Sequence, residues 1–163
     1  MRNSVKVALA VLAFTMGGAV VAQAQATSGS GTLSVSANVL SAITVTGNDL
    51  VFGNVAPTQT KTIAAANGGR FDITASPSSQ VSVTFDLPAD LGDPKVYVDT
   101  WTALTNTTND PVTGASALST ATAAPVSVSA TGNAYVWLGG TLHTAGATPG
   151  SYSGTVTLNL TYN

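Results

Sequence analysis

Near its C-terminal end the chain reads Tyr152-Ser-Gly-Thr-Val-Thr-Leu-Asn-Leu-Thr-Tyr162, and apolar residues alternate there with polar ones. Successive side chains of a β-strand point to opposite faces, so the apolar residues at even positions share one face. Such sustained alternation is typical of a strand with one buried face. This segment therefore predicts a strand that is covered on one side only.

A second alternating run lies near the N-terminal end, at residues 32–46, with its apolar residues at odd positions. At about 3.3 Å per residue it is long for one strand of a small domain, so we expect it to bend or split near residues 40–42. The residues that we expect on its exposed face are mainly serine and asparagine. The apolar residues of its first part are Leu33, Val35, Ala37 and Val39.

Seven further strands are expected, and no stretch has the apolar stripe of an amphipathic helix. Glycine, proline and asparagine turn signals separate the strands at short intervals, which favours two packed antiparallel sheets. A Thr- and Ala-rich stretch at 105–124 is expected to be a long loop. The fold class predicted is an all-β antiparallel sandwich in a single domain, 27–163. The seven additional strands are placed at 50–55, 61–66, 71–75, 81–87, 96–104, 126–130 and 134–142.

The first 26 residues are expected to be a signal peptide. Arg2 and Lys6 precede an apolar stretch at 7–21, and small residues then offer cleavage after Ala24 or Ala26. The remaining sequence has no second long apolar run, so no membrane span is expected in the mature form. The sequence thus predicts an exported protein.

Composition argues against several functions. Only 7% of the 163 residues are charged, and five Lys and Arg against seven Asp cannot form the basic patch that nucleic acid requires. The absence of cysteine excludes disulfides, thiolate catalysis and Cys-based zinc sites. His143 is the only imidazole, and the sequence shows no partner for it, nor a paired carboxylate system. We therefore expect no catalytic residues, no cofactor and no enzymatic activity.

Two smaller groups of residues have competing interpretations. Asp86, Asp90 and Asp93 lie close together, as in oxygen-ligand cation sites, but they also flank turn residues, and the sequence leaves calcium binding undecided. The aromatic residues are expected to pack in the core or at an edge of the sandwich rather than to form a sugar-binding platform. These aromatic residues are Tyr97, Trp101, Tyr135 and Trp137.

The C-terminal run resembles the C-terminal signature of chaperone–usher pilins, which combines a glycine, alternating apolar residues and a penultimate aromatic. The matching residues here are Gly150, Val156, Leu158, Leu160 and Tyr162. More of the chain is similar to a small secreted bacterial family called domain of unknown function 4402. That similarity lies in Asp-Leu-Val-Phe-Gly-Asn-Val at 49–55, Phe-Asp-Ile-Thr at 71–74, Leu-Gly-Gly-Thr-Leu at 138–142 and Gly-Ser-Tyr-Ser-Gly at 150–154. The chain is also similar, more distantly, to spore-coat-protein-U-like pilins, which usually carry a disulfide that this sequence lacks.

The resemblance implies an immunoglobulin-like, pilin-like sandwich from the periplasm, cell surface or exterior of a Gram-negative bacterium. In pilins an incomplete sandwich accepts the N-terminal segment of a neighbour. By that analogy, residues Leu33, Val35, Ala37 and Val39 are the candidate donor. Gly150, Val156, Leu158, Leu160 and Tyr162 belong to the candidate assembly strand, and the expected partners are further copies or a surface-assembly partner, with the use of a chaperone and usher left open.

Two functions follow from the sequence. The first is a structural subunit that assembles by strand donation. The second is a monomeric extracellular module that binds a glycan or a protein through Tyr135, Trp137 or the loop 105–124. Nine expected strands are enough to close a sandwich, so the run 32–46 is alternatively the first strand of a complete monomer.

Overall fold

The computed structural model describes residues 32–163, and the expected signal peptide at 1–26 lies outside the described residues. Residues 38–163 form one compact unit. The described elements are β1 (Thr44–Asn48), β2 (Thr60–Ile63), η1 (Ala65–Asn67), β3 (Gly69–Thr74), β4 (Gln80–Asp86), β5 (Val96–Asn106), β6 (Ser116–Leu118), β7 (Ala124–Ser127), β8 (Asn133–Thr144) and β9 (Thr157–Tyr162). In this part of the chain, no helix has the length and apolar character needed to cross a bilayer.

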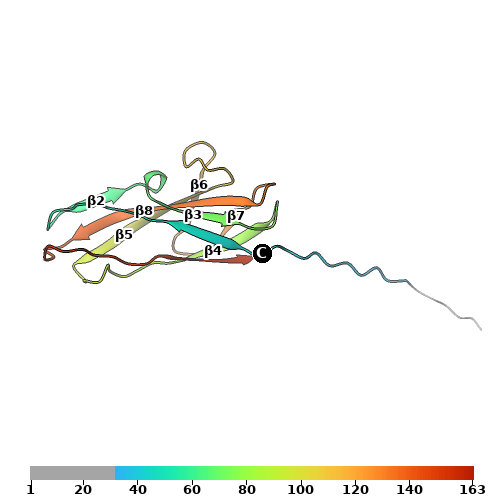
Figure 1. Ribbon diagram of the computed structural model, residues 1–163, viewed down its shortest axis with the longest axis horizontal. Coiled ribbons are helices and arrows are strands. Elements are labelled where there is room, and N and C mark those ends of the chain that lie inside the picture. Colours follow the sequence, from blue (N-terminus) through green and yellow to red (C-terminus); the bar gives the residue numbers. More distant parts are fainter. Residues whose placement is uncertain (1–31) are drawn as a thin grey trace, which may run out of the picture. The chain divides into compact units, whose positions relative to one another are not determined.

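The strands form two antiparallel sheets (Figure 1), which confirms the all-β prediction. The larger sheet has six strands in the order β1-β3-β8-β5-β6, and β2 pairs with the later part of β8. The smaller sheet has three strands in the order β7-β4-β9. Because β9 has β4 as its only partner and β1 has only β3, each lies at an edge of its sheet.

The hydrophobic core lies between the two sheets. Ile73 and Val136 from the larger sheet share one buried cluster with Val81, Val83 and Leu158 from the smaller sheet. The period of two places these side chains on inner faces, while neighbours such as Thr157 and Asn159 are exposed. The packing of two sheets around one core is that of a β-sandwich.

The N-terminal alternating run forms a strand only in its last part. Strand structure was expected over 32–46 with a bend or split near 40–42, but residues 32–43 belong to no strand and β1 begins at Thr44. Ser41, in the stretch where a bend or split was expected, is hydrogen-bonded to both Ser76 and Tyr162. The backbone amide of Ser41 donates to Oγ of Ser76 at 2.6 Å, and the hydroxyl of Tyr162 donates to the carbonyl of Ser41 at 2.7 Å.

Three other segments differ most from the prediction. Residues 50–55 form no strand, whereas β6 is a strand inside the expected loop 105–124. In addition, β9 begins at Thr157 rather than at residue 152. Thr157 pairs with Asp86 at the end of β4, and Pro88 follows two residues after Asp86. Proline has no amide hydrogen to donate, so the ladder ends near that point.

Candidate functional site

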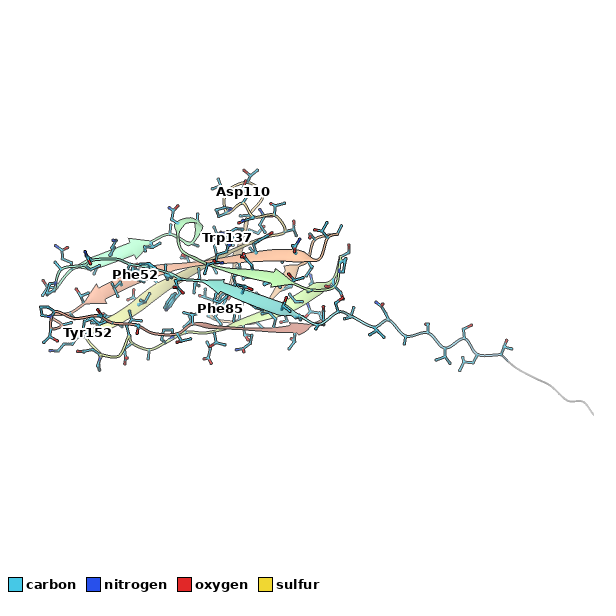
Figure 2. All side chains as sticks on the ribbon, in the orientation of Figure 1. Phe52, Phe85, Asp110, Trp137 and Tyr152 are labelled. Atoms are coloured by element: carbon cyan, nitrogen blue, oxygen red, sulfur yellow. The ribbon has the colours of Figure 1, made fainter. Side chains whose placement is uncertain are left out.

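A groove of about 950 Å³ lies between two segments that are far apart in the sequence. One wall is formed by residues 47–57, which start at the end of β1, and the other by residues 147–156, which lead into β9. Phe52 and Tyr152, one from each wall, are labelled in Figure 2. Sequence reasoning had not identified residues 47–57 as part of a site, although the family resemblance includes most of them.

The floor of the groove is apolar. Val96, Val98 and Leu142 from the larger sheet are buried there, and they form a second hydrophobic cluster beside the main core. Phe52 and Tyr152 pack against this cluster from the two walls. The side chains beneath the groove are therefore apolar, which favours an occupant with apolar side chains.

The backbone of both walls is largely without partners. No backbone–backbone hydrogen bond involves residues 50–55 among the described residues. In residues 150–156 the amide of Ser153 donates to the carbonyl of Leu91 at 3.1 Å, and no other bond of this kind involves that stretch among the described residues. Both stretches have strand-like sequences, so their free amide and carbonyl groups are available to a further strand.

Inner-face side chains near the edge strands are incompletely covered. Val45 of β1 faces the core beside Ile73, yet it is 39% exposed. Phe71 of β3 and Leu160 of β9 are only partly buried against the core. Since β1 and β9 are edge strands and these inner-face side chains beside them are only partly covered, the sandwich is incompletely closed along β1 and β9.

The predicted C-terminal assembly residues lie along this open side. Leu158 is buried, and Val156, Leu160 and Tyr162 are partly buried against the same core. Gly150 lines the groove. The shared face predicted for Val156, Leu158, Leu160 and Tyr162 is therefore confirmed.

The predicted donor residues have a different environment. Leu33, Val35 and Val39 are exposed to 88%, 89% and 91% of their area, respectively, and Ala37 is exposed as well. Large apolar side chains with this exposure are uncommon as a continuous row and indicate a contact surface.

The groove lacks the groups that acid–base catalysis requires. Among its lining residues, Asp49 and the phenol of Tyr152 are the only ionisable side chains. Neither His143 nor any second carboxylate lines it. A general acid and base need positioned partners, so this groove is suited to binding rather than to such chemistry.

His143 has a partner that the sequence did not reveal. Its Nε2 lies 2.9 Å from Oδ1 of Asp99, and its ring stacks on Tyr97 with centroids 4.9 Å apart. The hydroxyl of Thr100 donates to the Asp99 carboxylate and lowers the pKa of Asp99, and the hydrogen bond with His143 lowers this pKa further. No serine or threonine hydroxyl is hydrogen-bonded to His143 among the described residues, so no nucleophile accompanies the pair.

The acidic cluster forms turns. Oδ1 of Asp90 accepts from the amide of Gly92 at 2.9 Å, and Oδ1 of Asp93 accepts from the amide of Lys95 at 2.8 Å. Among residues 32–163, no three His, Cys, Asp or Glu side chains come together as potential metal ligands, Asp86 included. The carboxylates of Asp90 and Asp93 thus have a local structural role in these turns.

Trp137, a candidate for ligand contact, is only 4% exposed. It stacks with Tyr135 at 6.0 Å, and the guanidinium of Arg70 lies 6.0 Å from the Tyr135 ring centre. Arg70 also donates to Oδ1 of Asn109 at 2.9 Å, which ties the loop after β5 to this face. Trp101 packs against both hydrophobic clusters. The expectation that these tryptophans serve packing is confirmed.

The loop after β5 should make the stability of the fold sensitive to acid. The backbone amides of Thr113 and Val112 donate to Oδ1 of Asp110, labelled in Figure 2, and lower its pKa. The unfolded value is about 3.9, so ionised Asp110 stabilises the fold above about pH 4, and this contribution is lost as the pH falls through the folded-state pKa. Asp110→Ala should therefore lower the melting temperature at neutral pH and make its decline below about pH 4 shallower. Thermal denaturation across this range measures both effects, and equal acid slopes for the two proteins would contradict them.

The fold and the groove together define a β-sandwich protein with an open, apolar edge. The chain belongs to the family described as Domain of unknown function (DUF4402), whose family model matches residues 42–162. Searches of curated proteins and of solved structures found no match.

Proposed function

We propose that this protein is an exported, non-enzymatic structural subunit of the bacterial cell surface that self-associates by β-strand addition, as pilins do. One observation carries the proposal. The same chain holds a row of exposed, alternating apolar residues at 33–39 and a sandwich that is open along β1 and β9. In strand addition, main-chain hydrogen bonds supply affinity and pockets for alternate side chains supply specificity.

The edges of the sheets also favour this function. Proteins that must remain monomeric protect their edge strands with charged residues or proline. Neither β1, Thr44–Asn48, nor β9, Thr157–Tyr162, contains a charged residue or a proline. Both edges are therefore permissive for pairing with another chain.

The proposed location follows from the N-terminal sequence. A signal-peptide pattern at 1–26 would direct the chain out of the cytoplasm. Before assembly, an uncharged open edge would need protection against aggregation. A dedicated chaperone that adds its own strand to β9 would give that protection, and the fold class in this proposal is the immunoglobulin-like sandwich of pilins.

The alternative, a monomeric module that binds a glycan or protein, has less support. Its proposed anchor Trp137 is 4% exposed, and the loop after β5 is tied to the same face through Asn109. An aromatic platform requires an accessible ring face.

The proposed function is tested with the protein produced with its N-terminal segment and purified after export. We expect multimers by size-exclusion chromatography with light scattering, and fibres or clusters by electron microscopy. Deletion of residues 27–40 should leave only monomers or unstable protein. If the intact protein stayed monomeric at all concentrations and the deleted form were an equally stable monomer, self-association by strand donation would be wrong.

A further inference from the structure

We propose that the groove between residues 47–57 and 147–156 is the acceptor for residues 33–39 of a second copy, which insert antiparallel to β9. This inference rests on the proposed function and assigns it a site, a partner and a direction. A second hollow, near Gln80 and Asn106, is lined mainly by polar residues and therefore lacks such an apolar floor.

The walls of the groove supply the first argument. Residues 50–55 have a strand-like sequence but no backbone partner, and residues 150–156 are nearly as free. Leu50 and Phe52 on one wall and Tyr152 and Val156 on the other are partly buried at alternating positions. The two stretches therefore resemble strands whose shared neighbour is missing. One inserted strand has two edges and can pair with both walls.

The occupant is matched to the groove by pattern and charge. Apolar residues of 33–39 occupy odd positions, so an extended segment presents all of them to one side, where Val98 and Leu142 form the floor. Ser34, Ser36 and Asn38 then face solvent. The stretches 33–39 and 150–156 have the same length, and neither contains a charged residue. Leu33 and Val35 are 88% and 89% exposed, so their apolar surface is available for burial against another copy.

The point where the segment joins the sandwich determines the direction. Ser41 is hydrogen-bonded to Tyr162 at the end of β9, whereas the groove flanks the residues that precede the start of β9. A segment fixed there would have to reverse direction at residues 40–42 to enter its own groove. Insertion into another copy needs no such reversal. Every strand pair in both sheets is antiparallel, and antiparallel addition beside residues 150–156 continues that pattern. The two walls run in opposite directions, so the same inserted strand would be parallel to residues 50–55.

This geometry gives a head-to-tail contact. The end of the donor domain marked by Ser41 and Tyr162 would meet the end of the acceptor marked by Gly150. Because donor and acceptor surfaces differ, the donor copy still has a free groove and the acceptor copy still has a free segment. Such heterologous contacts give open chains rather than closed dimers.

The natural absence of cysteine permits a direct test. In the double variant Asn38→Cys/Ser151→Cys, both thiols replace exposed polar side chains, and antiparallel insertion of residues 33–39 along 150–156 brings Asn38 of one copy opposite Ser151 of the next. The matched control is Asn38→Cys/Thr62→Cys, in which the second thiol lies on β2, away from the groove. Both proteins are purified after export, treated with a short thiol cross-linker at about 10 µM and separated under denaturing conditions. Thiols held side by side have an effective concentration in the mM range, so the groove pair should give about 100-fold more covalent multimers than the control.

The outcomes separate this inference from the proposed function. A ladder of covalent multimers for the groove pair alone supports the insertion. Cross-linked monomers would overturn it in favour of insertion into the chain's own groove. Multimers that light scattering detects but that cross-link equally in both variants would overturn the groove assignment and leave self-association standing. Absence of multimers in the unmodified protein would overturn both.

Discussion

The double variant Leu33→Asp/Val35→Asp is expected to be a folded monomer that no longer assembles. Each large apolar side chain contributes about 1.5–3 kcal/mol when it is fully buried, so the two substitutions remove about 3–6 kcal/mol and weaken association about 10²- to 10⁴-fold. Burial of the new carboxylates would weaken it further. Both side chains are highly exposed in the single chain, so the substitutions should not prevent folding. Size-exclusion chromatography with light scattering measures the change.

The matched control is Ser34→Asp/Ser36→Asp. It introduces the same charge into the same segment, but on the opposite face of an extended chain. This control should still form multimers at low micromolar concentration. If both double variants lost assembly equally, net charge rather than burial of the apolar row would be the cause.

Gly139→Ala should lower the free energy of unfolding by about 3 kcal/mol, the upper end of the usual cost of overpacking. A Cβ at this position of β8 would contact the carbonyl oxygen of Ile63, and it would lie 2.5 Å from the amide nitrogen of Ala65 and 2.6 Å from the carbonyl carbon of Ala64. These are backbone atoms, which cannot rotate away as a side chain can. Urea denaturation followed by circular dichroism measures the difference.

The control for Gly139→Ala is Gly47→Ala on β1. The nearest atoms to a Cβ there belong to the Phe71 ring, at 3.7 and 3.8 Å, which is ordinary van der Waals contact. We expect a change within about 0.5 kcal/mol, as for most surface substitutions. Equal stability of the two variants would contradict the close approach of the β2–η1 connection to β8.

Local pattern predicted the strands that have one buried face. The even-numbered apolar residues of β9 pack against the core, and their neighbours are exposed, as the alternation indicated. The same reasoning failed at 50–55, where the pattern is strand-like but no strand forms. A strand-like pattern indicates that a segment can pair with another strand, but among the described residues no strand pairs with 50–55. Conversely, β6 is a short Ser-Ala-Leu stretch with no alternation that becomes a strand by pairing with β5.

The candidate site was less accessible from sequence than the fold. Its walls come from residues 47–57 and 147–156, which follow β1 and precede β9, and only the packing of the two sheets brings them together. The pair formed by Asp99 and His143 was missed for the same reason, because the register between β5 and β8 joins residues 44 positions apart. Non-local pairing is thus the information that one sequence did not provide.

The central claim is that the groove binds the apolar row of residues 33–39. The most direct test adds a synthetic peptide of residues 32–40 to the Leu33→Asp/Val35→Asp variant, whose own segment no longer competes, and follows the melting temperature. At about 100 times the dissociation constant, binding stabilises the fold by about 2.7 kcal/mol, which raises the melting temperature by roughly 8 °C. The same peptide with aspartate at the positions of Leu33 and Val35 should cause no shift. A melting temperature unchanged by the unmodified peptide, or raised equally by both peptides, would contradict the claim.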